Sequence, residues 1–134
     1  MALLERIKKH EGFRSRVYKC TEGFDTIGYG FAIKDLEIDE DIAEMILMRK
    51  LDDLMNRIQT KFYWWRSAED EVKDVVVEMC YQLGVSGFSK FKKTIDHLQS
   101  KRYGKAAVEM LDSRWAKQTP SRAIELSNII KNLE

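Results

Sequence analysis

Glu11 is the side chain whose type and position best suit acid chemistry. It shares a helical face with Leu4 and Ile7, which the core is expected to bury, and it falls in the last helical turn, where the helix dipole disfavours negative charge. Both effects favour the protonated carboxyl, and a carboxyl that is protonated near neutral pH can act as a general acid. Spacing alone favours a plainer interpretation, a glutamate at the edge of a core face with its carboxylate in water.

Thr26 is the second candidate, and its meaning depends on its neighbours. Strand periodicity places it on one face with Phe24 and Gly28, and places Asp25 on the other face. A strand threonine is ordinarily just a good β-former, so alone it indicates no chemistry. Gly28 and Gly30 in the same stretch indicate a bend or a close approach of the backbone.

The elements that must position these residues are a short helix and a small sheet. Helical spacing predicts a helix that ends at Glu11, with Gly12 as the residue that stops it. Residues 16–31 alternate between β-prone and turn-like stretches and predict a small antiparallel hairpin or sheet. From Asp39, an N-cap candidate, the period is helical again and predicts a helix of about twenty residues that could connect two lobes.

The rest of the chain predicts a helical lobe with short connections. The residues that mark the predicted helix starts and stops are Ser67 and Asp70, Gly84, Ser89, Gly104, and Thr119-Pro120. The positions predicted to face inward are Leu47, Leu51, Leu54, Ile58, Val72, Val76, Met79, Leu83, Phe91, Ile95, Leu98, Ala107, Met110, Leu111, Ala123, Leu126, Ile130 and Leu133.

Composition restricts the class of function. The 134 residues carry 23 Lys and Arg against 22 Asp and Glu, a formal net charge of +1, so charge gives no argument for nucleic acid as a partner. With 44% hydrophobic and 34% charged residues, the chain suits one folded domain or two small lobes. We expect no signal peptide and no membrane-spanning helix. Cys20 and Cys80 are predicted to be free thiols of a chain made in a reducing compartment.

Other features have ordinary structural explanations. The aromatic run Phe62–Trp65 is expected to pack at a lobe junction, and the alternative is a plug for a membrane or a partner. The acidic residues at 39–41 are typical of a first helical turn rather than of a metal site. Cys80 is expected in the core, and His97 is expected to face solvent.

The order and spacing of the motifs resemble those of the phage T4-type lysozymes, a family of glycoside hydrolases. The family pattern is a helix that ends in E-G, a short gap, Y-x-D-x-x-G, and then T-I-G-x-G-H. The resemblance is specific over 1–31 and 78–123 and weak between them, and the chain is short for the type after Phe31. The matching residues include Glu11-Gly12, Tyr18, Gly23, Thr26-Ile27-Gly28 and Gly30 in the first region, and Gln82-Leu83-Gly84, Gly87-Phe88, Ser113-Arg114-Trp115 and Gln118 to Ala123 in the second.

The resemblance implies a fold and an activity. The fold is α+β, mostly helical and two-lobed, with residues 1–134 as a single lysozyme-like domain. The N-lobe, about 12–60, holds the small antiparallel sheet, the C-lobe is about 61–134 plus the helix at 1–11, and a long helix joins the lobes. The implied activity is hydrolysis of the β-1,4 bond between N-acetylmuramic acid and N-acetylglucosamine in peptidoglycan, which leads to lysis of the host cell.

The resemblance also implies a site, residue by residue. Glu11 matches the general acid, Thr26 the threonine that helps to hold the attacking water, and Arg122 an arginine near the acid in the other lobe. An aromatic face at Tyr81 could stack on a sugar ring. The substrate-binding positions implied by the match are Glu22, Ala32, Tyr81, Gln82, Glu109 and Arg122.

Cys20 is the main departure, because the family has Asp at that position. Glycoside hydrolysis normally uses two carboxyl groups, and an ordinary thiol is mostly neutral at pH 7. The thiol could polarise a water or attack the sugar as a thiolate. Otherwise the site is weakened, the chain is an engineered variant, or Glu22 supplies the carboxylate. Because Glu11 and Thr26 are both present, we expect an active enzyme in which Cys20 is the third catalytic residue.

These inferences predict a phage-type muramidase without a metal or a cofactor. Its expected partner is peptidoglycan, with no nucleic acid and no stable membrane insertion, and the chain is expected to be a monomer. It would be made in the host bacterial cytoplasm and reach the periplasm or cell wall with the help of a holin or as part of a phage tail. The alternatives are a catalytically weakened relative that binds peptidoglycan and a helical interaction module.

Overall fold

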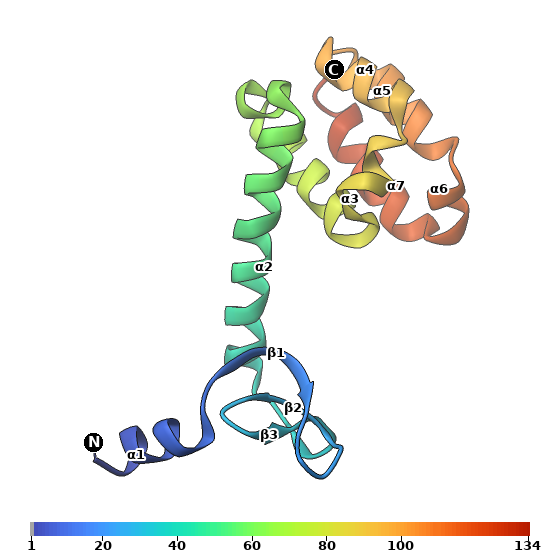
Figure 1. Ribbon diagram of the computed structural model, residues 1–134. Coiled ribbons are helices and arrows are strands. Elements are labelled where there is room, and N and C mark those ends of the chain that lie inside the picture. The colour runs from blue at the N-terminus through green and yellow to red at the C-terminus, as the bar shows by residue number, and fades with distance from the viewer. Residues whose placement is uncertain (1) are drawn as a thin grey trace. The chain divides into compact units, whose positions relative to one another are not determined.

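The computed structural model describes residues 2–134. The chain is α+β and mostly helical, with one small antiparallel sheet, as the resemblance implied (Figure 1). Its contacts divide it into unit 1, which ends at Glu44, and unit 2, Met45–Glu134. The division falls inside the long helix α2 (Glu40–Lys61). The lobe boundaries expected from the sequence, including the assignment of helix 1–11 to the C-lobe, stay predictions.

Unit 1 contains one helix and a three-stranded sheet. The strands pair in the order β1-β2-β3, and both pairs are antiparallel. The central strand aligns Thr26 with Tyr18 on one side and with Ala32 on the other. The predicted sheet is therefore confirmed, with a third, very short strand. The elements are α1 (Ala2–Glu11), β1 (Arg14–Lys19), β2 (Asp25–Gly28), β3 (Phe31–Ala32) and the 3-10 turn η1 (Ile33–Asp35).

Two of the positive-φ glycines of unit 1, Gly12 and Gly23, set the end of α1 and the β1–β2 turn. Gly12 has φ +71° and donates its N–H to the Lys8 carbonyl at 2.9 Å, which ends α1 where the sequence predicts. Gly23 has φ +86° and donates its N–H to the Cys20 carbonyl at 2.8 Å, which closes the turn between β1 and β2. Both positions require a backbone conformation that other residues adopt only with strain.

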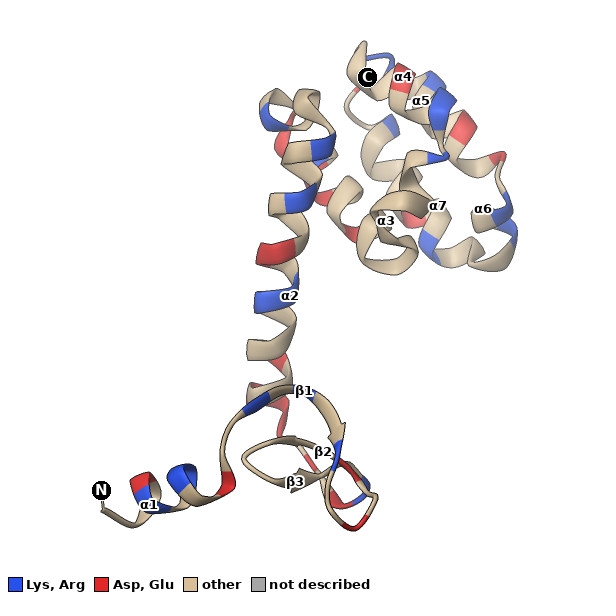
Figure 2. Ribbon diagram, in the orientation of Figure 1, with Lys and Arg blue, Asp and Glu red and all other residues tan. Residues whose placement is uncertain are grey.

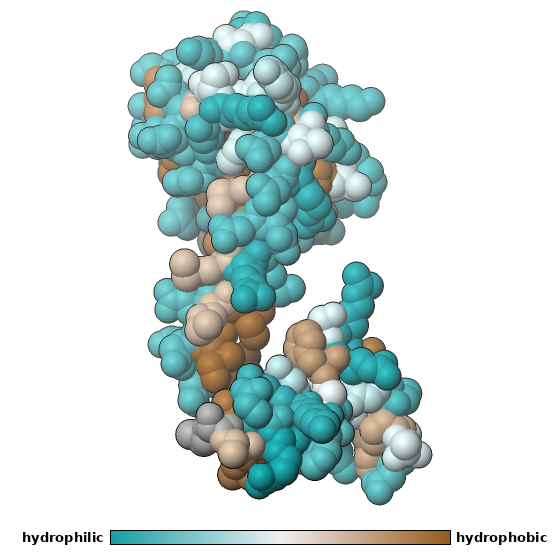
Figure 3. Space-filling view, turned by 60° about the vertical axis from the view of Figure 1, so that its left-hand side comes forward, coloured by the Kyte–Doolittle hydropathy of each residue, from teal (hydrophilic) through white to brown (hydrophobic). Residues whose placement is uncertain are grey.

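Unit 1 by itself does not bury the apolar face of α1. Leu4 and Ile7 are 48% and 46% exposed, and α1 has no buried residue. The reason is that a ten-residue helix and strands of at most six residues do not form a second packed layer in unit 1. Ile42 and Met45 in the first half of α2 are exposed too, and Figure 3 shows such apolar surface in brown.

All the regular elements described in unit 2 are helices. Residues of both charges alternate along α2, which is typical of a solvated helix (Figure 2). No helix among residues 2–134 is long and apolar enough to cross a membrane. The remaining elements are η2 (Tyr63–Ser67), α3 (Asp70–Ser89), α4 (Lys92–Gln99), α5 (Tyr103–Leu111), α6 (Arg114–Gln118) and α7 (Pro120–Lys131).

The hydrophobic core lies in unit 2. Phe88 is fully buried, with its ring centroid 5.5 Å from that of Phe62 and 6.1 Å from that of Phe91. Leu111 was expected inside but is 45% exposed, because Tyr103 and Ala106 take the inner face of α5. Leu47 is also exposed. The predicted inward positions that are buried are Leu54, Ile58, Val72, Val76, Met79, Leu98, Ala107, Met110, Ala123, Leu126 and Ile130.

The expectations for the aromatic run are confirmed in part, and the expectation for His97 is not. Phe62 and Trp65 are buried as expected, and the Trp65 indole N–H donates to the Lys73 carbonyl at 3.2 Å. Tyr63 is 77% exposed, so the expectation is wrong for this residue. His97 is half-buried and its Nδ1 accepts from Arg102 Nε at 3.0 Å, so it does not simply face solvent.

Several predicted helix ends are displaced. Ser67 does not cap α3: it lies in η2 and its hydroxyl donates to the Trp64 carbonyl. Ser89 ends α3 instead of starting α4. Thr119 precedes α7 as predicted, but its hydroxyl donates to the Trp115 carbonyl at 3.0 Å rather than capping. Gly84, with φ +78°, interrupts α3 where the helix was expected to close.

Candidate active site

The Glu11 carboxyl lies against the backbone of the β2–β3 turn. A Cβ built on Gly30 would overlap Glu11 Oε2 and would lie 3.2 Å from Glu11 Cδ. Gly30 also has φ +78°, so the turn depends on glycine both for its conformation and for the space that Glu11 fills. The Lys8 Nζ atom lies 5.9 Å from the centre of the Tyr29 ring, a second contact between α1 and this turn. The close backbone approach expected at this glycine is confirmed.

Thr26 is held at the centre of the sheet. It is only 4% exposed, and the exposure alternates along β2 as the period-two pattern predicted. Its hydroxyl donates to the Phe24 carbonyl at 2.9 Å. The hydroxyl oxygen also has lone pairs with which it can accept a hydrogen bond from another group.

Cys20 lies in the β1–β2 turn, half-buried, in surroundings that favour its thiolate. The backbone N–H of Phe24, and then that of Glu22, hydrogen-bond to the sulfur and lower the pKa of the Cys20 thiol below its ordinary value. The Thr26 hydroxyl acts in the same direction on this pKa, whereas loss of solvent and the Glu22 carboxylate oppose it. The net direction is downward, so a larger fraction of Cys20 is thiolate at a given pH than for an ordinary thiol.

The Phe24 peptide unit links the two candidates. Its carbonyl accepts both the Cys20 N–H, at 2.9 Å, and the Thr26 hydroxyl, also at 2.9 Å, while its N–H points to the Cys20 sulfur. Sequence reasoning missed Phe24, because a backbone group leaves no signature in the type of the residue. The structure thus brings Cys20 and Thr26 together through one peptide.

Of the other residues considered in unit 1, Glu22 and Ala32 lie beside Cys20 or Thr26, and Asp25 lies on the opposite face of the sheet. Glu22 lies near enough for its charge to act on the Cys20 sulfur. Ala32 is paired with Thr26 in the sheet. Asp25 forms an ion pair with Lys19 at 2.7 Å and is exposed, so it stands on the side away from Thr26, as the strand period predicted.

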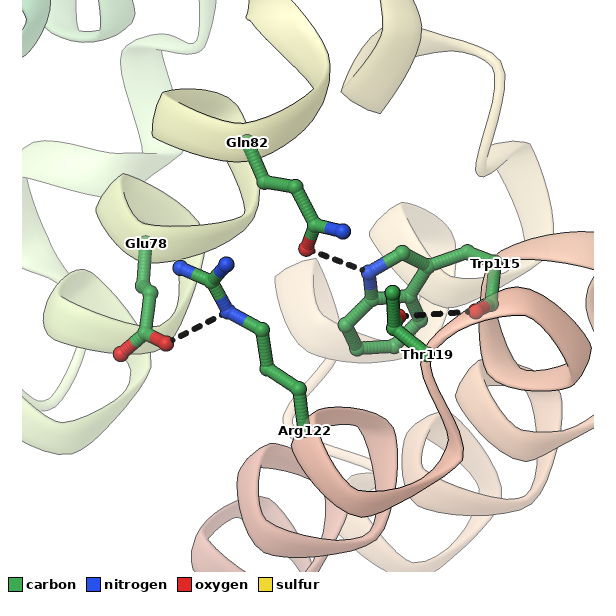
Figure 4. Close-up of polar contacts among 5 residues, drawn as sticks. All are labelled: Glu78, Gln82, Trp115, Thr119 and Arg122. Atoms are coloured by element: carbon green, nitrogen blue, oxygen red, sulfur yellow. Dashed lines mark hydrogen bonds and ion pairs between the residues drawn. The ribbon is translucent and has the colours of Figure 1, made fainter.

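In unit 2, Arg122 and Gln82 are held by specific partners. Arg122 Nε donates to Glu78 Oε2 at 2.8 Å, and Trp115 Nε1 donates to Gln82 Oε1 at 2.8 Å (Figure 4). Trp115 is 4% exposed, which makes it a fixed support for the Gln82 amide. These contacts join α3 to α6 and α7.

Two cavities of unit 2 contain further candidates. Glu109 lines a cavity of about 520 Å³ whose wall includes Phe91, Trp115 and Thr94. Thr94 is a buried polar residue of that wall, at 2% exposed. Tyr81 is 48% exposed and lines a second cavity of about 340 Å³.

These groups suit acid-assisted hydrolysis. Among residues 2–134, no cluster of three His, Cys, Asp or Glu side chains is arranged to hold a metal ion. Unit 1 offers the Glu11 carboxyl at the end of α1, the Thr26 hydroxyl on β2, and the Cys20 thiol, with its lowered pKa, in the β1–β2 turn. A proton donor and a group that can take a proton from water are the components that glycoside hydrolysis requires.

Comparison with known proteins gives consistent matches along nearly the whole chain. The phage lysozyme family model matches residues 8–128. A Dictyostelium discoideum protein named "Probable T4-type lysozyme 2" is 26% identical over 159 aligned residues, which cover 97% of this chain and 94% of that relative. The pre-baseplate central spike protein of Enterobacteria phage T4 is 26% identical over 158 residues, which cover 97% of this chain and 28% of that relative.

Proposed function

The chain belongs to the phage lysozyme family and is a lysozyme-type glycosidase, and we propose that it hydrolyses the β-1,4 bond between N-acetylmuramic acid and N-acetylglucosamine in bacterial peptidoglycan. The observation that supports this proposal is the contact of the Glu11 carboxyl with Gly30, in the turn that leads out of β2, the strand that holds Thr26.

Glu11 acts as the general acid in the proposed reaction. It gives its proton to the glycosidic oxygen as the bond between that oxygen and the sugar C1 breaks, and the leaving sugar departs with the proton. Positive charge then develops at C1 and the ring oxygen. The Glu11 carboxylate and the Cys20 thiolate are two negative groups of unit 1 that would stabilise this charge.

Cys20 and Thr26 deliver the water. The Thr26 oxygen, whose own proton is fixed on Phe24, accepts one hydrogen bond from the water. The Cys20 thiolate takes the water proton as the water oxygen bonds to C1. The lowered pKa of Cys20 supports this role, because an ordinary thiol would hold too little thiolate near pH 7.

The substrate-binding roles follow the same assignment. Glu22 and Ala32 would contact the glycan in unit 1, beside Cys20 and Thr26. In unit 2, the exposed Tyr81 ring would stack on a sugar, and Gln82 would donate its amide N–H groups. Glu109 and Arg122 complete the proposed list of binding residues.

Two alternatives for Cys20 stay within the same family. As a thiolate it could attack C1 directly, form a thioglycoside and give a retained anomer after hydrolysis. Alternatively, replacement of a carboxylate by a thiol leaves a protein that binds peptidoglycan and barely cleaves it.

The similarity to a central spike protein supports delivery as part of a phage tail over delivery through a holin. In either route the monomer would act on the peptidoglycan of the periplasm or cell wall and contribute to host lysis.

The test compares the native chain with Glu11→Gln and Cys20→Asp on chloroform-treated Gram-negative cells, followed by turbidity. We expect lysis by the native chain and a loss of about 10²- to 10⁴-fold in Glu11→Gln. Glu5→Gln removes an exposed carboxylate from the same helix and should lyse as the native chain does.

The outcomes separate the alternatives. Lysis that persists in Glu11→Gln would overturn the acid assignment. Binding to cell walls without lysis, with activity gained in Cys20→Asp, would favour the weakened relative. An inverted product anomer supports the water-activating thiolate, and a retained anomer supports covalent attack. Absence of both binding and lysis would leave only the interaction module.

A further inference from the structure

The ion pair between Glu78 and Arg122 has a geometry that stability alone does not explain. Both side chains are substantially exposed, at 46% and 36%, and such solvent-exposed pairs contribute little to folding. The pair nevertheless has a short bond of 2.8 Å, and it joins α3 to α7 across 44 residues of sequence. The motifs that suggested Arg122 say nothing about Glu78.

We propose that Glu78 is a positioning residue, which accepts the Nε–H of Arg122 so that the terminal nitrogens of the guanidinium are held ready to donate to oxygen atoms of the wall glycan. This inference rests on the proposed function, which places Arg122 among the substrate-binding residues. It assigns Glu78 no contact with the substrate.

The choice of atom supports this role. A carboxylate that pairs with an arginine through two parallel N–H···O bonds occupies at least one terminal nitrogen. Here Glu78 Oε2 bonds to Nε, so both terminal nitrogens keep their N–H groups for other acceptors. In Figure 4 these two nitrogens point into the space between Glu78 and Gln82.

Gln82 is supported in the same way by Trp115. Its carbonyl oxygen accepts the indole N–H at 2.8 Å, which leaves the amide N–H groups as donors. Each binding residue is thus held through one end by a supporting residue, and its donor groups stay free. Two fixed sets of donors from α3 and α7 suit a ligand rich in oxygen acceptors, such as the N-acetyl carbonyls and carboxylates of peptidoglycan.

The physical benefit is preorganisation. A free arginine side chain must lose rotamer freedom when it binds, and that loss weakens affinity. Glu78 restricts Arg122 before the ligand arrives, and its negative charge balances that of the guanidinium. Removal of Glu78 should therefore weaken ground-state binding and leave the chemical step unchanged, which means a higher KM with the same kcat.

The first measurement needs no activity. In a ¹⁵N–¹H spectrum of the native chain, the Arg122 Nε–H should exchange slowly with solvent, because it is bonded to Glu78. Glu78→Gln should speed this exchange, while Asp74→Asn, which removes an exposed charge one turn earlier on α3, should not. An Nε–H that exchanges equally fast in all three proteins would overturn the positioning role.

The second measurement is kinetic, on soluble peptidoglycan fragments. Glu78→Gln should raise KM about tenfold with kcat within a factor of two, as expected for one side chain that is no longer immobilised. Asp74→Asn should match the native chain, and Glu78→Asp should restore part of the affinity. The exchanged pair Glu78→Arg with Arg122→Glu keeps the ion pair but moves the guanidinium to α3, so it should not recover the native KM.

The results distinguish this inference from the proposed function. If the native chain neither binds nor cleaves the fragments, the proposed function itself fails. If the native chain is active and Glu78→Gln has the native KM, only the role of Glu78 is wrong. Recovery of the native KM by the exchanged pair would show that the ion pair is structural and would also overturn the positioning role.

Discussion

Units 1 and 2 are organised by different physical means. Every residue of the hydrophobic core lies in unit 2, from Leu54 onward, whereas the buried residues described in unit 1 are Thr26 and Gly28. Unit 1 instead owes its form to positive-φ glycines, an antiparallel ladder and the hydrogen bonds of the Phe24 peptide. The proposed catalytic residues lie in the unit that backbone geometry organises. Precise placement of reacting groups in this chain therefore depends on turns more than on packing.

The two cysteines show the same contrast within one residue type. Cys20 in unit 1 has its pKa lowered by backbone N–H groups, because a turn presents donors to the sulfur. Cys80 in unit 2 is 1% exposed, and burial raises the pKa of its thiol to about 12. Packing thus raises the pKa of one thiol, and a turn lowers that of the other.

The prediction with the largest expected effect tests whether side-chain packing stabilises unit 2 but not unit 1. Phe88→Ala removes a fully buried ring and should lower the free energy of unfolding by about 3–5 kcal/mol. Phe24→Ala removes the same atoms from a ring that is 42% exposed in unit 1 and should cost less than about 1 kcal/mol. Urea denaturation followed by circular dichroism measures both. Equal losses would show that unit 1 also depends on a packed core.

The next effect concerns the turn that carries Glu11. Gly30→Ala and Gly12→Ala each place a side chain at positive φ, which costs about 1–2 kcal/mol of stability. A Cβ at position 12 has no atom within 4 Å, whereas one at position 30 overlaps the Glu11 carboxyl. The two variants should therefore have similar stability, but Gly30→Ala should lose much more lytic activity than Gly12→Ala does.

Gly12→Ala serves as the matched control for Gly30→Ala. Activity and urea midpoints are measured on both variants under identical conditions. If the two variants keep the same activity, the contact between Glu11 and Gly30 has no part in placing the acid, and backbone geometry does not position the site.

The sequence predicted the elements that repeat a pattern. The helical stripe of Val72, Val76 and Met79 is buried as expected, and so is Ile130 in α7, because periodic burial needs only the spacing of apolar residues. Helix ends were less predictable. Ser67 and Thr119 have the side chains of caps, but each hydroxyl donates to a carbonyl of the preceding turn, a choice that depends on local backbone angles.

The candidate site shows the same limit. The types and order of Glu11 and Thr26 could be read from the chain, and so could the close approach at Gly30. The environment of Cys20 could not, since it is made by peptide N–H groups that every residue possesses. The exposed face of α1 was also unpredictable, because amphipathic spacing describes a face without naming what covers it.

The smallest expected effect is the pH response of the two thiols. The unfolded Cys80 thiol ionises as pH rises through its ordinary value of 9.0, while the folded thiol stays protonated to about 12. The stability that this raised pKa contributes is complete below pH 9 and is lost above it, by about 1 kcal/mol at pH 10. Cys20 has the opposite sign, because its lowered pKa adds stability as pH rises.

Two measurements check this contrast. Urea denaturation from pH 8 to 10 should show a steeper fall in stability for the native chain than for Cys80→Ala, and a steeper fall for Cys20→Ala than for the native chain. Iodoacetamide at pH 7.5 should label Cys20 in the folded protein and Cys80 only after unfolding, as mass spectrometry would show. Labelling of both thiols at equal rates in the folded chain would mean that the turn does not activate Cys20, and the proposed transfer of a water proton to its thiolate would lose its physical basis.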